Sequence, residues 1–528
     1  MTTSPFSISF TMAYASPYID RDIILLAGVK RVKEEVDLLI TGGALLTMDD
    51  AGTMYEDGGI AIRGDRIVAV GRSSKLKEEY SGDETIDAKR KAIMPGLVDT
   101  YGHAGHGLIG GFHNPIHGWP AGRLYWHATT DRWWYAEAQL AATERLRFGV
   151  TTGASIIGST PARTDSPVFG IRNAEAYAKV GIRAVLGVGP PDLFIPHISV
   201  PWSGSFLEKG EWVEREFTYE EALANSVEVI EKWHRGADGR IRIALAPPYI
   251  FGRHTQRGRH GTQYKPEDIP VMVEKAEEIR DLADSHGVQI HTHIFGGSVD
   301  FALEHFGRET VERILGPDVV IAHGNGLKPS EVEVIGKTRS NVATAPSTAE
   351  NMWYGYPPIP ELLEAGANVS ISTDGSAPRF SFDLFKDISR AMWHQWMRFS
   401  TQDILPGGKA LRMVTIDAAK ALGMDQEVGS LEPGKKADVI LVDLDRPHLT
   451  PTTYLPHLLT FYVNGNDVET VVVGGEVLME EGKIWSVDVQ EVMELARTEA
   501  EKAFDLVDLD DFRPSDRTFW HGTRYQRE

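Results

Sequence analysis

Residues 93–103 read IMPGLVDTYGH, and this stretch decides the fold of the chain. It holds a short apolar run with one Pro-Gly pair, followed by Asp99 and then by His103. An apolar run without alternation is typical of a parallel strand that is buried on both faces. Polar side chains at the carboxyl end of such a strand are typical of the face where β/α barrels keep their chemistry. The stretch therefore predicts a barrel strand that opens into a metal site.

The middle of the chain, residues 93–427, alternates apolar strand candidates with helical stretches, which predicts parallel β/α units. With the opening stretch the strand candidates number eight, as in a TIM barrel, and the length fits such a barrel. We therefore predict an α/β fold with a (β/α)8 barrel over residues 93–427. The other seven strand candidates are residues 149–158, 182–191, 241–250, 288–295, 319–326, 341–348 and 369–375.

Both ends of the chain have a different, β-rich pattern. Residues 36–92 read as short strands separated by Gly-Gly and Gly-Asp turns, and residues 428–485 return to this pattern. We predict one small composite β-sandwich domain built from both segments, with two separate β-meanders as the alternative. Residues 1–35 are predicted to be an extension that packs on the body or on a neighbouring subunit. Residues 486–528 are predicted to be a C-terminal helical tail.

The composition limits partners and ligands. The 528 residues carry a formal net charge of −21, which argues against nucleic acid and anionic membranes as partners, because both bind basic surfaces. The chain has no cysteine, so a metal has to bind to His, Asp, Glu or a modified Lys. No apolar run is long enough to predict a membrane helix, and the first residues lack the pattern of a secretory signal. We expect a cytoplasmic protein.

Four predicted strand ends carry side chains that could bind a metal. They are His103, then His291 and His293, then His323, and finally Asp374. One histidine at a strand end is usually a hydrogen-bonded structural residue, and for a single one we would favour that interpretation. Four strand ends at one barrel mouth favour a metal site, since neutral imidazoles and a carboxylate are the ligands of zinc, iron and manganese sites.

Residues 93–103 resemble the first barrel strand of the amidohydrolase superfamily, which ends in His-x-His. Residues 429–443, GSLEPGKKADVILVD, resemble the signature of its composite domain. The resemblance implies one divalent metal ion per chain, zinc first, with iron or manganese as alternatives. The implied metal ligands are His103, His293, His323 and Asp374, while His291 is expected to be a supporting residue near the substrate.

The resemblance also implies a mechanism with one metal. The fourth predicted strand ends in Ala246-Pro247-Pro248-Tyr249, so the carboxylated lysine that bridges two metals in other branches is absent. Metal-bound water has a pKa of about 7 instead of 15.7, which yields hydroxide at neutral pH. The implied catalytic residues are Asp374, which would carry the proton from this water to the leaving nitrogen, and His323, which would steady the oxyanion or aim the water.

Two positions depart from the family pattern. Tyr101 stands where the first His of His-x-His is usual, and similar thiocarbamate and phenylurea hydrolases also lack that His, having Asn there. Tyr101 could line the pocket, bind weakly as a phenolate or disable the site. Gly296 stands where deaminases and triazine hydrolases usually have Glu, three residues after His293. Because this Glu moves a proton to a ring nitrogen, its absence favours an amide, urea or carbamate substrate.

Aromatic and imidazole side chains gather after the first, seventh and eighth predicted strands, around the barrel mouth. Such walls suit a partly apolar or aryl substrate. Relatives commonly form dimers or larger assemblies, so a homo-oligomer is expected. The predicted substrate contacts are Tyr101, His106, His113, Trp119, His291, Trp353 and Tyr354, with Arg379 as a further polar contact.

The sequence thus predicts a metal-dependent hydrolase that cleaves the C–N bond of an amide, urea or carbamate. Its expected substrate is a small molecule that is partly apolar or that has an aryl or heterocyclic group. The enzymatic alternative is a deaminase or dechlorinase of a heterocycle, which a carboxylate such as Glu350 beside the metal would favour. The third possibility is a catalytically dead, metal-free homologue that has lost its metal through Tyr101.

Overall fold

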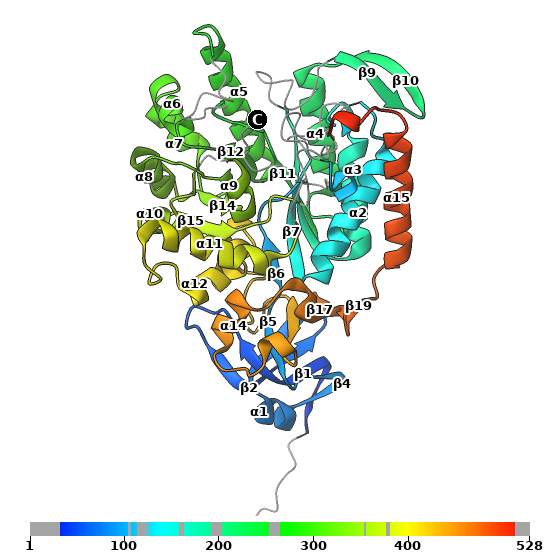
Figure 1. Ribbon diagram of the computed structural model, residues 1–528, viewed down its shortest axis with the longest axis vertical. Coiled ribbons are helices and arrows are strands. Elements are labelled where there is room, and N and C mark those ends of the chain that lie inside the picture. Colours follow the sequence, from blue (N-terminus) through cyan, green and yellow to red (C-terminus); the bar gives the residue numbers. More distant parts are fainter. Residues whose placement is uncertain are drawn as a thin grey trace, which may run out of the picture.

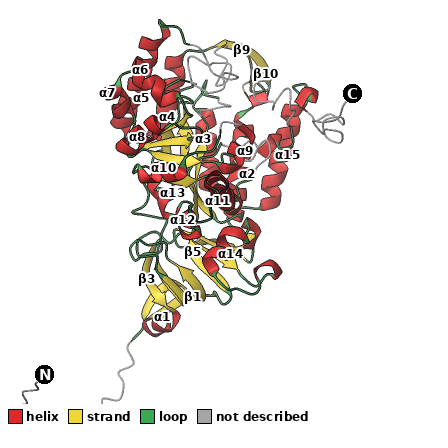
Figure 2. Cartoon of the chain, turned by 60° about the vertical axis from the view of Figure 1, so that its left-hand side comes forward, coloured by secondary structure: helices red, strands yellow, loops and turns green. Residues whose placement is uncertain are grey.

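The computed structural model describes residues 32–103, 107–112, 124–125, 127–157, 163–191, 203–252, 264–352, 355–375 and 381–512. These residues form a barrel surrounded by helices and a separate sheet that lies below it in Figure 1. Figure 2 shows the same two parts from a second direction, with the strands of the sheet gathered at the end where the described chain begins. No helix among the described residues combines the length and the apolar character needed to cross a membrane.

Eight parallel strands form the barrel, and their order in space is their order along the chain. A parallel bridge between Gly102 and Asp374 joins the two ends of the series, so the barrel is nearly closed. Each strand overlaps a predicted strand, and the TIM barrel is confirmed. The strands are β6 (Leu97–Asp99), β7 (Val150–Ile156), β8 (Arg183–Val188), β11 (Ile241–Leu245), β12 (Ile290–Ile294), β13 (Val319–His323), β14 (Asn341–Thr344) and β15 (Asn368–Ile371).

Helices cover the outside of the barrel (Figure 1). Side-chain caps fix where two of the long ones begin: Thr130 accepts a hydrogen bond from the backbone N–H of Trp133, and Thr218 forms a capping box with Glu221. The helices are α2 (Asp131–Arg147), α3 (Val168–Val180), α4 (Tyr219–Trp233), α5 (Asp268–His286), α6 (Ser298–His305), α7 (Arg308–Ile314), α8 (Pro329–Thr338), α9 (Pro346–Met352), α10 (Ile359–Glu364), α11 (Leu384–Phe399), α12 (Gly407–Arg412) and α13 (Ile416–Ala421).

The second sheet draws its strands from both chain ends, as predicted. Strand β5 unites them, because it pairs in parallel with β1 and antiparallel with β16. Ile40, Ile93 and Leu441 come from these three strands and are buried in one cluster. The elements are β1 (Glu34–Leu46), β2 (Met54–Arg63), β3 (Arg66–Arg72), α1 (Ser73–Glu79), β4 (Tyr80–Asp87), β5 (Lys91–Pro95), β16 (Val439–Asp443), β17 (Val468–Val473), β18 (Glu476–Glu480) and β19 (Lys483–Ile484).

Residues 93–103 are divided between the composite sheet and the barrel. We expected residues 93–99 to be one barrel strand, but β5 ends at Pro95 in the composite sheet and the barrel begins with β6. Gly96 lies between them, and a Cβ atom there would be 2.1 Å from the hydroxyl oxygen of Thr151 on β7. The glycine lets the chain pass this close to β7 as it leaves one sheet for the other.

Helix α15 (Val489–Phe504) packs along α2 on the outside of the barrel (Figure 1). The ring of Phe504 lies 5.1 Å from that of Phe112 and 6.3 Å from that of Trp133, centroid to centroid. Part of the predicted C-terminal helical tail is therefore a helix that packs on the outside of the barrel. The remaining elements are the hairpin of β9 (Ser203–Glu208) and β10 (Glu211–Glu216), α14 (Leu455–Phe461), and the short turns η1 (Gly107–Ile109), η3 (Pro447–Leu449), η4 (Gly465–Asp467) and η5 (Asp510–Phe512).

Candidate active site

The barrel brings the strand-end residues to one mouth. His293 lies in β12, His323 ends β13, and Asp374 follows β15. At the seam the backbone N–H of Asp374 donates to the carbonyl of Tyr101 at 3.0 Å, and the N–H of His103 donates to the carbonyl of Asp374 at 2.9 Å. These two bonds place the His103 Nε2 atom 3.5 Å from Asp374 Oδ1.

Tyr101 lies at the centre of the three imidazoles. Its ring centroid is 5.8 Å from that of His103, 5.5 Å from that of His293 and 5.6 Å from that of His323. The rings of His293 and His323 stack 5.2 Å apart. The side chain of Tyr101 is buried in the barrel, where it packs in a cluster with Ile156 and small residues of the neighbouring strands. Tyr101, the residue that departs from the family pattern, is therefore surrounded by the three histidines predicted to bind the metal.

A hydrogen bond joins Tyr101 to His293. The Tyr101 hydroxyl lies 2.8 Å from His293 Nε2, while His293 Nδ1 lies 2.9 Å from the carbonyl oxygen of Pro248. A carbonyl only accepts, so Nδ1 carries the proton and Nε2 accepts from the Tyr101 hydroxyl. Burial also raises the pKa of Tyr101 well above its usual value, which keeps it a neutral phenol. The lone pair that a metal would use on His293 is thus shared with this hydroxyl.

Two of the site residues have left-handed backbone conformations. His323 has a φ of 70° and Asp374 a φ of 69°, both in the region that glycine favours. Such conformations persist in non-glycine residues only where the surroundings hold them, and they cluster at functional sites. One such support is Thr348, whose hydroxyl donates to Asp374 Oδ2 at 2.6 Å. Thr348 was not among the predicted site residues, because nothing in the order of residues 346–352 marks it.

The donor set suits a divalent metal in its chemistry. Both ring nitrogens of His323, and Oδ1 of Asp374, are buried without a hydrogen-bond partner among the described residues. Burial lowers the pKa of His323 to about 4, so its ring is neutral and can bind a metal. However, no three His, Asp or Glu side chains of the described chain are arranged closely enough to hold a metal. The residue types therefore fit a divalent metal. In this arrangement, however, the Tyr101 hydroxyl is hydrogen-bonded to the His293 nitrogen that a metal would bind.

His291 lies on the same side of β12 as His293, two residues closer to the start of the strand. Its Nε2 atom is 3.4 Å from Gln289 Oε1, and burial lowers its pKa to about 3. This agrees with a supporting role below the mouth. Tyr249, which the sequence analysis did not select, lies closer to the site, with its ring 5.2 Å from that of His293. The predicted contacts His106, His113, Trp119, Trp353, Tyr354 and Arg379 lie outside the described residues.

The carboxylates of Glu331 and Glu350 have partners outside the predicted metal ligands. Glu331 of α8 is fully buried, and its oxygens accept backbone N–H groups of Gly297 and Val299 at 2.9 to 3.0 Å. Glu350 of α9 pairs with His394 of α11 at 3.0 Å. A Glu350 carboxylate beside the metal would favour a deaminase, but its described partners are His394 and Arg390, which lie outside the predicted ligand set.

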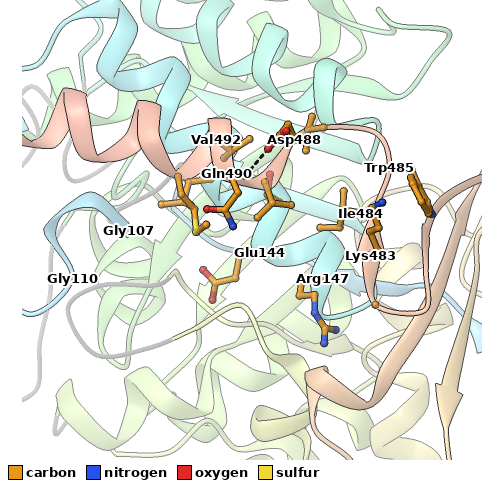
Figure 3. A pocket seen from close by; sticks show the side chains of 16 residues that line it. Gly107, Gly110, Glu144, Arg147, Lys483, Ile484, Trp485, Asp488, Gln490 and Val492 are labelled. Atoms are coloured by element: carbon orange, nitrogen blue, oxygen red, sulfur yellow. Dashed lines mark hydrogen bonds between the residues drawn. The ribbon is translucent and has the colours of Figure 1, made fainter.

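Away from the barrel mouth, a hollow of about 1020 Å³ lies between α2 and the start of α15 (Figure 3). Figure 3 shows Glu144 and Arg147 of α2 on one side and Gln490 of α15 on the other. None of the predicted site residues that the structure describes lines this hollow. We therefore take the histidine-rich mouth of the barrel, and not this hollow, as the candidate active site.

The barrel and the residues at its mouth define the class of protein, a barrel hydrolase. The chain belongs to the amidohydrolase family, whose sequence profile matches residues 92–478. The predicted class, a hydrolase that acts on C–N bonds, is confirmed by this membership and by the relatives of the chain. Family membership also agrees with a metal-dependent reaction.

The chain is similar to curated relatives along nearly their whole length. It is 32% identical to the 5'-deoxyadenosine deaminase of Methanosarcina acetivorans over 88% of this chain and 98% of the relative. It is 29% identical to the 5-methylthioadenosine/S-adenosylhomocysteine deaminase of Syntrophobacter fumaroxidans over 87% of this chain and 97% of the relative.

The fold is similar to solved structures that contain zinc. An adenosine deaminase from Xanthomonas campestris with bound zinc has a TM-score of 0.73 at 21% identity, over 90% of this chain and all of that one. The atrazine chlorohydrolase from Arthrobacter aurescens in complex with zinc has a TM-score of 0.68 at 22% identity, over 88% of this chain and all of that one. At this identity the likeness shows the barrel fold.

Proposed function

We propose that this protein hydrolyses an amide, urea or carbamate C–N bond in a small molecule that is partly apolar or has an aryl or heterocyclic group. The observation that carries this choice is Gly296, three residues after His293. Deamination of a ring carbon needs an acid that protonates the ring nitrogen, whereas amide, urea and carbamate cleavage needs an acid only at the leaving nitrogen. Glu331 and Glu350 bind other partners, which supports the same choice.

We propose that one divalent metal ion binds to His103, His293, His323 and Asp374. When bound, the metal would supply a Lewis acid and a water molecule of lowered pKa. The zinc in the two structures of similar fold supports zinc as the metal. The pairing of His293 with Tyr101 means that His293 becomes available only when this hydrogen bond opens.

Asp374 is suited to carry the proton. Its Oδ2 is held by the Thr348 hydroxyl, while Oδ1 faces His103 at 3.5 Å across the seam. One oxygen is therefore oriented and the other is directed toward the site, where it can accept a proton and return it to the leaving nitrogen. His323 is neutral and buried, so it can bind the metal through one ring nitrogen. Alternatively, where the other three residues hold the metal, its N–H can donate a hydrogen bond to the oxygen that gains charge in the transition state.

The test is an ammonia or amine release assay on the zinc-loaded protein. Aryl amides, phenylureas and aryl carbamates form one panel, and 5'-deoxyadenosine, 5-methylthioadenosine and S-adenosylhomocysteine form the other. We expect turnover in the first panel and its loss in Asp374→Asn. Turnover of only the second panel would contradict the proposal.

Deamination of a 5'-modified adenine nucleoside is the second candidate function. The deaminases of Methanosarcina acetivorans and Syntrophobacter fumaroxidans, 32% and 29% identical, favour it. A replacement for the missing glutamate would then have to come from another side chain or from the substrate. The nucleoside panel identifies this reaction directly, because adenine and hypoxanthine absorb ultraviolet light differently.

We further propose a cytoplasmic homo-oligomer. The cysteine-free composition supports the compartment. Large apolar side chains are exposed on α11 and at both ends of α14, which contacts it, and they support self-association, since such side chains in water often mark interfaces. Light scattering of the protein beside a Met397→Lys variant tests this. The exposed side chains are Trp393 and Met397 on α11, and Tyr454 and Tyr462 beside α14.

A further inference from the structure

A buried guanidinium lies beneath the point where the barrel closes. Arg145 extends from α2 and, like Asp99 of β6, has no exposed side-chain surface. Its Nε and Nη2 atoms donate to Asp99 Oδ2 at 3.2 and 3.0 Å, and Nη2 also donates to the carbonyl of Ala154 at 2.9 Å. Nη1 donates to the hydroxyl of Tyr177. The planar fork of arginine can serve these three partners at once, which a lysine cannot do.

From Asp99 the hydrogen bonds lead to Asp374. Asp99 Oδ1 accepts the backbone N–H of Thr373 at 3.0 Å, and Oδ2 accepts the Thr373 hydroxyl at 2.7 Å. Thr373 is the residue directly before Asp374, whose left-handed backbone needs support from its surroundings. Asp99 therefore anchors the peptide that presents the Asp374 carboxylate.

From Tyr177 the hydrogen bonds lead to His103. The Tyr177 hydroxyl donates to Ser155 Oγ at 3.1 Å, and Ser155 Oγ donates to the carbonyl of His103 at 3.4 Å. The guanidinium also lies against the backbone of the same segment. A Cβ atom on Gly102, which precedes His103, would be only 2.4 Å from Arg145 Nη2. The contact thus needs a glycine at this position.

We infer that Arg145 is a positioning residue of the active site. It acts on Asp374 through Asp99 and Thr373, and on His103 through Tyr177 and Ser155. By bracing both sides of the seam, it fixes the approach of His103 Nε2 to Asp374 Oδ1, which is 3.5 Å in the structure. The inference rests on the proposed function, in which these two side chains hold the metal. Partners that orient metal ligands in this way typically change metal affinity or activity 10- to 100-fold when altered.

The chain offers a matched control in a second buried pair. Arg183 of β8 donates to Asp438 through Nε at 2.8 Å and Nη2 at 3.0 Å, and both side chains are nearly fully buried. This pair joins the barrel to the composite sheet and has no hydrogen bond to the strand-end residues. Arg183→Lys therefore removes the same kind of interaction away from the barrel mouth.

The test compares Arg145→Lys with Arg183→Lys by zinc competition against a chromophoric chelator and by thermal unfolding. We expect both variants to melt at lower temperature than the wild type. Only Arg145→Lys should lose zinc affinity, by about 10- to 100-fold. Equal zinc affinity in the two variants would overturn the inference.

A crystal structure of each variant gives a second readout that needs neither metal nor substrate. The separation of His103 and Asp374 should widen in Arg145→Lys and be retained in Arg183→Lys. Wild-type protein that binds no zinc would overturn the proposed metal site. In that case the separation of His103 and Asp374 in the two variants still tests whether Arg145 positions these residues. If Arg145→Lys does not fold, Thr373→Val removes only the hydroxyl bond to Asp99, and Thr415→Val, which removes a buried hydroxyl bond to Leu411, is its control.

Discussion

Tyr101 is the residue on which the chemistry of this site depends. The sequence marks it as the departure from His-x-His, but it cannot tell whether the phenol binds a metal, lines the pocket or blocks the site. The structure places its hydroxyl on the lone pair of His293. The hydroxyl is therefore a competitor of the metal for one ligand, because the neutral phenol donates where the metal would accept electrons.

Tyr101→Phe tests this competition. Removing the hydroxyl keeps the buried ring but frees His293 Nε2, so zinc should bind about tenfold more tightly, the equivalent of roughly one net hydrogen bond. Chelator competition measures the affinity. Weaker binding in Tyr101→Phe would instead identify Tyr101 as a ligand, and Tyr249→Phe, which alters a neighbouring ring, serves as the control.

The buried histidines make stability depend on pH. Burial lowers the pKa of His291 to about 3 and that of His323 to about 4, whereas a histidine in the unfolded chain has a pKa of about 6.5. Above pH 6.5 both states are neutral. As the pH falls from 6.5 toward 3 to 4, the unfolded chain binds protons that the folded chain does not, so the metal-free protein loses stability.

Urea unfolding between pH 8 and pH 4 checks this. His291→Asn should flatten the curve below about pH 6.5, with a change of about 1.4 kcal/mol for each unit by which burial lowers the pKa. His457→Asn alters an exposed histidine of α14 and should leave the slope as it is. A wild-type curve that stays level down to pH 4 would contradict the burial of neutral histidines.

At the scale of elements, the barrel strands could be predicted because each is a short apolar run followed by polar, glycine or proline residues. The division of residues 93–99 between two sheets could not, because it depends on the contact of Gly96 with Thr151 of another strand. The hairpin of β9 and β10 was also missed. Most side chains of β10 are exposed, so the alternation that marks a half-buried strand is absent.

The ligand positions followed from the same strand ends, but the contacts that shape the site did not. From their helices Thr348 reaches Asp374 and Arg145 reaches Asp99, at sequence distances that no local pattern reveals. Hydrogen bonds of this kind arise only when the barrel has closed. This is why the candidate ligands could be named from the sequence, whereas the hydrogen bond between Tyr101 and His293 could not be predicted.

Glu331 links two helices behind the site. Its carboxylate, carried by α8, accepts the N–H groups of Gly297 and Val299 at the start of α6 and also caps its own helix through Lys328. Glu331→Ala leaves these groups without partners and should lower the free energy of unfolding by about 3 kcal/mol. Urea unfolding measures this loss. Glu333→Ala, on the exposed face of α8, should have little effect, and equal losses would contradict the capping role.

At the scale of the molecule, the C-terminal helix belongs to the barrel layer. Phe504 of α15 packs on Phe112 and Trp133, which lie on the segment after the first barrel strand and on α2. Phe504→Ala should cost about 2 kcal/mol of stability, less than for a fully buried phenylalanine. Leu506→Ala, at an exposed position, is the control. A Phe504→Ala variant as stable as the wild type would mean that α15 does not pack here in solution.

The two parts of the molecule meet where β5 ends and β6 begins. Tyr101, His103 and Asp374 lie beyond the other end of β6, where the barrel closes between the segments that follow β6 and β15. The central claim is that this closure and the facing strands hold a metal for hydrolysis in spite of Tyr101.

The most direct test is the metal content of the full chain, loaded with zinc, passed through gel filtration and analysed by mass spectrometry. We expect about one zinc per chain in the wild type and far less in Asp374→Ala, as a single tetrahedral site requires. No zinc in the wild type, with binding restored by Tyr101→His, would contradict the claim and identify the chain as a form whose site Tyr101 has disabled.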